Sequence, residues 1–484
     1  MKKWIIHILL FVFVFSACER PSSIVESDAL PPIYPDYTNI VIPVNIAPLN
    51  FLLRDSVEST EIVIEGKNNS FTMYEDEIVQ FSEKKWKRLV TSESGNKITI
   101  RITAKSNGKW IRYAPFYWKI VPDKLDPYLS YRLIEPGYEV WNKIQLCERR
   151  IETFDECVLA DNNLTDGSCM NCHIYGNQDA SLSMFHLRGK NGGTILNRDG
   201  KLRKINTKAE GQISPAIYGN FHPSGKYAVF STNTIIPEFH SLKNERLEVY
   251  DTESDIIIID LESNKVFSSP LLSGKANLET FPVFSTDGAK LYFCTAPAVP
   301  LPDSVRSLKY NLCSIDFHAS NGSFGTQIDT LFNGIEQNKS VCHPKTSPDG
   351  HFLLYTVADY GTFPIWHQET DLQMIDLRTG NIDSLTIVNS DRSDSYHSWS
   401  SNSRWFVFAS KRDDGLYGKP YFCYVDKNGE VHKPFVLPQR NPTKYDNFLK
   451  SFNIPELSKG PVPFNAVDIE KIRKEQIAET VSNR

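Results

Sequence analysis

Four fragments decide the fold: FHPSGKYAVFSTN (221–233), FSTDGAKLYFCTA (284–296), TSPDGHFLLYTVAD (346–359) and WSSNSRWFVFASKRDDG (399–415). Each fragment contains a tight turn of small and polar residues, followed by an aromatic-rich strand. A second strand-turn element follows each fragment, as in IIIIDLESNKVF (256–267). Units of this kind, repeated every 50–60 residues or so, predict a β-propeller. One unit cannot bury both faces of its sheet, so several must pack around a central channel.

The rest of the chain divides around this repeat. Residues 37–125 carry short alternating or β-branched runs such as NIVIPVNI (39–46) and NKITIRITA (96–104), which predict a small β-sandwich. The whole chain is therefore expected to be all-β, with the sandwich followed by a propeller of five or six blades. The expected segments are a sandwich at 37–125, a linker with one chemical motif at 126–184, the propeller at 185–445 and a tail with a short helix at 446–484.

The N-terminus predicts export. Its first residues, MKKWIIHILLFVFVFSAC (1–18), contain two lysines, an apolar run too short to span a bilayer, and small residues before Cys18. This pattern predicts a lipoprotein signal peptide over 1–17, cut before Cys18, whose thiol is then acylated. The alternative is an ordinary signal peptide with an incidental Cys18. Residues 18–36 are rich in proline, serine and acidic residues, and they are expected to form a flexible tether to a membrane facing the periplasm or the cell surface.

Charge and motif content exclude several classes of protein. The formal net charge is −5 and no basic stripe is present, so nucleic acid is not expected as a partner. The chain contains no G-x-S-x-G, no G-x-G-x-x-G, no phosphate-binding loop and no H-E-x-x-H. No hydrolase, kinase or dehydrogenase is therefore indicated.

One motif carries chemistry, in GSCMNCHIYG (167–176). Cys169, Cys172 and His173 form a C-x-x-C-H sequence, which is typical of covalent haem c attachment. Two thiols at this spacing can add to the two vinyl groups of one haem, and the following histidine can bind the iron. Glycine and asparagine around the motif predict a loop. The alternatives are a disulfide or redox pair between Cys169 and Cys172, and a zinc site, for which a second C-x-x-C is missing.

The sixth ligand of the iron would decide what such a haem does. Met184 and His186 follow the motif closely and are the favoured candidates. A vacant sixth position would instead favour ligand binding or peroxidatic chemistry. Four histidines in the repeat region are further candidates: His222, His343, His367 and His397.

The Ser-Pro-Asp-Gly turn followed by an apolar strand resembles the TolB-type, WD40-like propeller repeat. From residue 126 onward, the chain also resembles bacterial lipoproteins that join such a propeller to a single haem c motif, a group sometimes labelled cytochrome c biosynthesis or TolB-like proteins. The motif predicts one covalent haem c in this chain. Electron transfer or redox sensing is the usual role of haem c proteins and is therefore the expected function, with an unknown redox or envelope protein as partner. Two other functions stay open: an envelope scaffold that binds proteins or glycans without haem, and a haem peroxidase or reductase.

Overall fold

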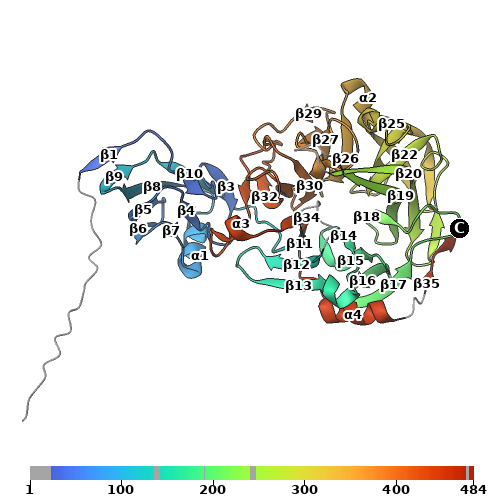
Figure 1. Cartoon of the computed structure of the whole chain (residues 1–484), viewed down its shortest axis with the longest axis horizontal. Coiled ribbons are helices and arrows are strands. Elements are labelled where there is room, and N and C mark those ends of the chain that lie inside the picture. Colours follow the sequence, from blue (N-terminus) through green and yellow to red (C-terminus); the bar gives the residue numbers. More distant parts are fainter. Residues whose placement is uncertain (1–22, 136–141, 190, 240–246, 476–478) are drawn as a thin grey trace, which may run out of the picture.

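The computed structural model describes residues 23–135, 142–189, 191–239, 247–475 and 479–484. The predicted signal segment and Cys18 lie outside these residues. A smaller N-terminal domain and a larger ring of sheets lie side by side (Figure 1). Among the described helices, none has the length and apolar character needed to cross a membrane.

The N-terminal domain contains two sheets and one helix. The larger sheet consists of β1 (Ile24–Glu26), β3 (Ile40–Pro43), β5 (Ser59–Glu65), β6 (Ser70–Glu75), β8 (Lys97–Ser106), β9 (Lys109–Arg112) and β10 (Phe116–Val121). The smaller sheet consists of β2 (Ile33–Tyr34), β4 (Phe51–Leu53) and β7 (Ile78–Val79).

The helix α1 (Glu83–Ser92) was not expected from the sequence. It begins at the Ser82 cap and buries Trp86, Leu89 and Val90, whose spacing places them on one face. Trp86 packs edge-on against Trp118 of β10, with ring centroids 5.6 Å apart. The helix therefore completes the core of this domain.

The expectation of a flexible tether over 18–36 is wrong for its described part. Residues of β1 pair in parallel with β9, and those of β2 pair with β4. Backbone hydrogen bonding to two sheets therefore fixes these residues, despite their loop-like composition.

The larger body contains six further sheets among the described residues. Five of them are consecutive four-strand units. They are β14 (Met170–Gly176), β15 (Asp179–Leu187), β16 (Gly193–Arg198) and β17 (Lys201–Asn206); β18 (Ile217–Phe221), β19 (Tyr227–Phe239), β20 (Leu247–Asp260) and β21 (Lys265–Phe267); β22 (Asn277–Phe284), β23 (Lys290–Pro297), β24 (Asn311–His318) and β25 (Ser323–Phe332); β26 (Ser340–Thr346), β27 (Phe352–Ala358), β28 (Asp371–Asp376) and β29 (Ile382–Asp383); β30 (Asp394–Trp399), β31 (Trp405–Ser410), β32 (Lys419–Tyr424) and β33 (Phe435–Val436).

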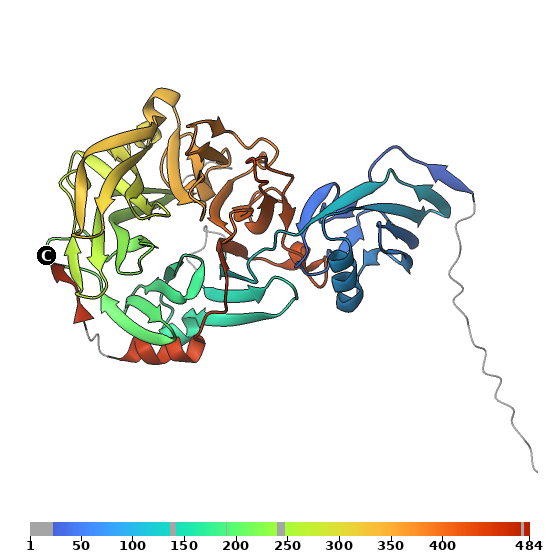
Figure 2. The ribbon, with the colours of Figure 1, turned by 180° about the vertical axis from the view of Figure 1, so that it is seen from behind.

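The remaining sheet joins two distant parts of the chain. It contains β11 (Tyr128–Ile134), β12 (Gln145–Arg150), β13 (Glu156–Asp161) and β34 (Ser451–Ser458), in the order β13-β12-β11-β34. The innermost strands β14, β18, β22, β26, β30 and β34 contact one another in succession, and β34 also contacts β14. The sheets therefore follow one another around a closed ring, which is a propeller-type arrangement (Figure 2).

This topology corrects one expectation. The stretch over 126–184 is not a linker, because it supplies three strands of one sheet and the first strands of the next. Residues 451–458 form a strand, because β11 offers them an open edge. The short helices α2 (Gly334–Gln337) and α3 (Lys444–Asn447) lie between strands. The tail contains α4 (Ala466–Lys474), β35 (Glu479–Thr480) and β36 (Ser482–Asn483), and the two strands extend the sheets of β17 and β21.

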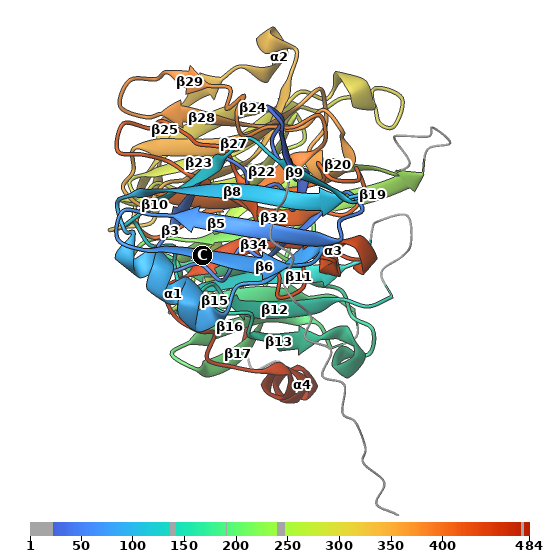
Figure 3. The same ribbon diagram turned by 90° about the vertical axis from the view of Figure 1, so that its left-hand side faces the viewer.

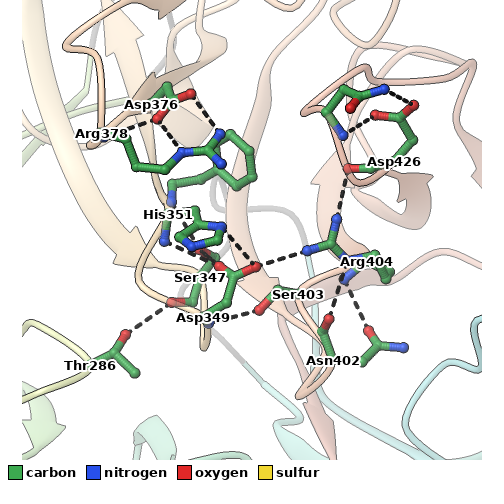
Figure 4. A network of polar contacts seen from close by, with 12 residues as sticks. Thr286, Ser347, Asp349, His351, Asp376, Arg378, Asn402, Ser403, Arg404 and Asp426 are labelled. Atoms are coloured by element: carbon green, nitrogen blue, oxygen red, sulfur yellow. Dashed lines mark hydrogen bonds and ion pairs between the residues drawn. The ribbon is translucent and has the colours of Figure 1, made fainter.

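The repeated turns connect neighbouring sheets. Figure 4 shows Thr286 donating to the Ser347 carbonyl at 2.9 Å, and the Asp349 amide donating to the Ser403 hydroxyl at 2.9 Å. Arg404 adds a 2.8 Å ion pair to Asp349. The same kind of contact closes the circle at the remaining junctions: Asn177 to Pro223, His222 to Gly288, Asp126 to Ser400 and Lys459 to Gln178. The turn motif therefore links each sheet to the next.

The cysteines outside the motif are mostly buried. Cys294, Cys313 and Cys423 lie inside strands and are at most 2% exposed. Cys147 and Cys157 are free and form no disulfide with each other. Cys147 lies opposite Val158 and Cys157 lies opposite Glu148, so the two thiols are on opposite faces of the sheet.

Candidate functional site

The C-x-x-C-H motif lies on the innermost strand of its sheet, and the expectation of a loop is wrong. His173 is within β14, and Cys169 directly precedes it. The pairing of β14 with β15 shifts register between Asn171 and Ile174. Cys172 and His173 therefore occupy a β-bulge, which interrupts the ladder without ending the strand.

The other five innermost strands carry a register irregularity at the corresponding place. One residue in each has a left-handed backbone, with φ between 49° and 52°, and each lines the same central cavity: Tyr218, Phe281, His343, Tyr396 and Ile454. The bulge of β26 also contains a Cys-His pair, Cys342 and His343, whereas the other four bulges contain none. The backbone geometry therefore does not require cysteine or histidine at 172 and 173, and only the β14 pair follows a further cysteine, Cys169, in a C-x-x-C-H sequence.

The cavity lies in the centre of the ring and has a volume of about 540 Å³. All six innermost strands contribute to its wall. The hairpin of β19 and β20, through Ile235 and Val249, and the segment that contains Phe363 and Trp366 also line it. Much of the wall is therefore apolar and aromatic, which is typical of sites for small molecules and cofactors.

His173 lies at the wall of this cavity and is only 4% exposed. Its Nε2 atom has no hydrogen-bond partner among the described residues. The nearest carboxylate oxygen is Oε2 of Glu456, at 3.9 Å. Burial, together with Arg132 and Lys345, lowers the pKa of His173 to about 3, so the imidazole is neutral at pH 7. Cys169 lines the same cavity.

Glu456 faces His173 from β34 and is itself buried. Burial raises its pKa to about 7, although Lys345 and the Tyr175 amide, which donates to its Oε1 at 3.2 Å, oppose this shift. Near pH 7 this carboxyl group is therefore about half protonated.

Two further histidines line the cavity. His397 is 3% exposed, and its Nε2 lies 2.9 Å from the Leu354 carbonyl. His343 packs against the ring of Phe281, with centroids 4.0 Å apart, and its Nδ1 has no partner in the described parts of the chain. Burial lowers the pKa of both histidines, so both are neutral at pH 7.

The two favoured sixth ligands do not lie on the cavity wall. Met184 packs in the apolar core between the sheet of β14–β17 and the sheet of β18–β21, where Leu196 and Phe230 also lie. His186 has its Nδ1 atom 3.2 Å from the Thr194 hydroxyl and borders a separate cavity. The structure therefore does not bring Met184 or His186 to face His173 across the cavity.

The remaining candidate histidines differ in their roles. His222 bonds to Ser224 at 2.7 Å and to the Gly288 carbonyl at 3.2 Å, so it holds a repeat turn. His367 directly follows Trp366 of the cavity wall and is buried, with its ring nitrogens 3.2 Å from Glu248 and 3.4 Å from Glu369. Burial alone would lower the pKa of His367, but its bonds to both carboxylates outweigh this effect and raise it to about 9.

Sequence reasoning missed Lys345 and Glu456 entirely. The pattern that could have revealed the cavity wall is the distance from each turn. The residue seven positions before each turn residue lines the cavity: 218 before 225, 281 before 288, 343 before 350 and 396 before 403. Lys345 lies two positions after one of these residues.

Comparisons with known proteins show little likeness. No family model matches the chain, and no curated protein matches it. A solved oligogalacturonate lyase in complex with manganese is 13% identical, covers 63% of this chain and 72% of its own, and has a TM-score of 0.36. A puromycin-hydrolyzing peptidase of Mycobacterium tuberculosis is 11% identical over 72% of this chain and 52% of its own, with a TM-score of 0.36. A prolyl endopeptidase is 14% identical over 65% of this chain and 42% of its own, with a TM-score of 0.37.

The match to the two peptidases thus spans about half of their length or less. TM-scores this low carry no argument about activity. The described residues contain no group of three or more histidine, cysteine, aspartate or glutamate side chains suited to hold a bare metal ion. The features that bear on function are therefore the motif residues and the cavity that they border.

Proposed function

We propose that this chain is an exported, lipid-anchored protein with one covalent haem c in the central cavity. The observation that carries the proposal is the buried Nε2 atom of His173. It has no hydrogen-bond partner among the described residues and borders a cavity that Cys169 also lines. A buried polar atom without a partner is costly, and a bond to iron would remove this cost.

In this proposal the haem forms thioethers with Cys169 and Cys172, and His173 is the proximal ligand. The bound haem would supply a one-electron redox change at its iron. The aromatic wall, including Tyr218, Phe281 and Trp366, would exclude water from the porphyrin faces. The chain would then transfer electrons or sense redox state, with the ring as a docking surface for a redox or envelope protein.

We also infer the finer architecture. The six sheets of the ring would be the blades of a six-bladed TolB-like propeller, and the two N-terminal sheets with α1 would be a β-sandwich. The circle of turn contacts and the pairing of β34 with β11 support this assignment. Cys18 would be acylated and would hold the domains at a membrane that faces the periplasm or the cell surface.

The test is a pyridine haemochrome assay on protein produced with a haem c maturation system. We expect covalent haem bands in the wild type, and their loss or replacement by single-thioether bands in Cys169→Ala and Cys172→Ala. Cys313→Ala is a matched control, because this cysteine is equally buried but lies in another sheet. A colourless wild type with the mass of the bare polypeptide would overturn the proposal and leave an envelope scaffold without haem.

One observation favours a haem peroxidase or reductase as a second candidate. Met184 and His186 are absent from the cavity wall, whereas His343 and His397 line it, so the sixth position would be open if neither of these histidines bound the iron. An open sixth position binds small molecules. A Soret shift on adding cyanide or carbon monoxide would support this candidate, and an unchanged band would exclude it.

A further inference from the structure

We propose that the central cavity also binds an organic carboxylate with an apolar body and a hydroxyl group, and that Lys345 binds its carboxylate. The site does not require the haem, but it uses the same aromatic wall that the proposed haem would contact, so it is proposed for the haem-free protein. It is built from residues of β26 and the neighbouring bulges, which the C-x-x-C-H motif does not include. The argument rests on an uncompensated cation, a fixed imidazole and an aromatic wall.

Lys345 is the uncompensated cation. Its ammonium group forms no hydrogen bond or ion pair with any part of the chain that the structure describes. Its charge nevertheless acts on four cavity groups: His173, His343, His397 and Glu456. Lys345 therefore lies amid the polar part of the cavity. A carboxylate from outside the chain could pair with this ammonium group at the cavity wall.

The acidic residues of the wall do not supply that anion. Glu135 forms an ion pair with Lys450 at 3.6 Å. Glu456 lies beyond ion-pair distance of Lys345, accepts a hydrogen bond from the Tyr175 amide, and is only partly ionised near pH 7. Lys411 of the wall is buried and donates to the Ile365 carbonyl at 2.6 Å. Arg188 is a further cation of the same wall, and Lys345 is assigned to the carboxylate because it lies two residues from His343 on β26.

His343 is the group for a hydroxyl. Its ring is held between Phe281 at 4.0 Å and Tyr396 at 4.9 Å, and its backbone has the left-handed φ of 52°. A neutral imidazole offers one donor and one acceptor, and its Nδ1 has no partner among the described residues. A hydroxyl group can satisfy either nitrogen.

The apolar body of the ligand would contact the aromatic wall. Tyr218, Phe281, Phe363 and Trp366 come from different sheets and line the same 540 Å³ space. This volume is within the range of ligand sites and exceeds what a single ring needs. Mandelate, which combines a phenyl ring, a hydroxyl and a carboxylate, is therefore a suitable probe.

Isothermal calorimetry with three related compounds tests the proposal. Mandelate carries both polar groups, phenylacetate lacks the hydroxyl and 1-phenyl-1,2-ethanediol lacks the carboxylate. We expect the wild type to bind mandelate at least about tenfold more tightly than the diol. Lys345→Met should reduce the affinity for mandelate to that for the diol and leave diol binding within about twofold. His343→Phe should remove the preference for mandelate over phenylacetate.

The control variant is Lys339→Met, at the residue directly before β26. This exposed lysine pairs with Asp359 at 2.6 Å, away from the cavity, and its loss should leave mandelate binding unchanged. Lys345→Gln repeats the test if the methionine variant fails to fold. No mandelate binding by the wild type, or equal binding by the wild type and both Lys345 variants, would overturn the proposal.

The two proposals fail in different ways. If the protein is colourless but binds mandelate through Lys345, the haem proposal is wrong and the carboxylate site stands. If the protein carries covalent haem but its mandelate binding does not depend on Lys345, the haem proposal stands and the carboxylate site is wrong. Protein made with and without the haem maturation system should both be titrated.

Discussion

At the scale of single residues, burial makes the ionised form of two carboxyl groups of the ring unfavourable. Burial raises the pKa of Glu279 to about 8, and the nearby Asp255 adds to this shift. Oε2 of Glu279 has no hydrogen-bond partner in the described part of the chain, and the residue is 3% exposed. Asp251 shows a similar effect, because burial raises its pKa to about 7. Both groups favour the protonated form in the folded state.

Glu279→Gln is therefore expected to stabilise the protein at alkaline pH. The folded pKa lies above the unfolded one, so the wild type loses stability as pH rises from about 4.5 to about 8. The neutral glutamine avoids this loss, and the free energy of unfolding at pH 8 should rise by about 2–4 kcal/mol. At pH 4.5 the variant should match the wild type. Urea unfolding at both pH values measures this, with the exposed Glu336→Gln as a control.

At the scale of elements, the hairpin of β19 and β20 lines part of the cavity. A cluster of three side chains connects this hairpin to a segment of another sheet. Glu248, on β20, contacts His367 at 3.2 Å and accepts a 2.8 Å hydrogen bond from the Tyr360 hydroxyl. Both partners lie near η3 (Pro364–Trp366), two sheets away from the hairpin. All three side chains are buried. The cluster therefore anchors the hairpin across the mouth of the cavity.

His367→Ala should release this anchor. It leaves Glu248 buried without its cation, which costs about 3–5 kcal/mol of unfolding free energy. We also expect faster amide hydrogen exchange over 247–250. The control is His351→Ala, because His351 is a half-exposed partner of Asp349 and its loss should cost well under about 1 kcal/mol. Equal effects of the two variants would contradict the anchoring role.

The sequence predicted the repeated elements because their turns are local. Gly225, Gly288 and Gly350 have positive φ, and glycine in such turns is visible without any tertiary information. Ser403 has the same backbone at φ 59° and fills the fourth position. Residues of β34 have no such mark, because they form a strand by pairing with β11, which lies more than 300 residues earlier in the sequence. The motif residues were found from spacing, whereas Lys345 and Glu456 were not, because nothing local shows that they face one cavity.

At the scale of the whole molecule, Figure 3 shows the N-terminal domain in front of the ring. The domain and the ring share one apolar core. Phe51 and Trp118 of the domain belong to the same buried cluster as Trp405 and Phe452 of the ring. Polar contacts border this core, including the Arg54–Asp446 pair at 2.7 Å. Nδ2 of Asn50 also donates to the Arg440 carbonyl at 2.9 Å. The two bodies are thus joined by packing and by directed bonds.

This shared core predicts one cooperative unfolding transition. Trp118 lies in the N-terminal domain, but Trp118→Phe should also lower the denaturation midpoint of the ring. The free energy of unfolding should fall by an amount typical of a core truncation, about 1–3 kcal/mol. Far-UV circular dichroism and tryptophan fluorescence should give coincident curves. The control is Tyr117→Phe, because Tyr117 is exposed on the neighbouring position of β10. Two separate transitions, with only one displaced in Trp118→Phe, would contradict the coupling.

The strand β34 is synthesised late, because it lies near the C-terminal end of the chain, and this has a consequence for biogenesis. A nascent chain exposes the thiol of Cys169 long before residues 451–458 leave the ribosome or the translocation channel, whereas in the finished ring that residue is only 7% exposed. Any enzyme that ligates a prosthetic group to this position must therefore act on an open, horseshoe-shaped intermediate. The pairing of β34 would then close the ring around the attached group, so attachment at Cys169 would come before ring closure.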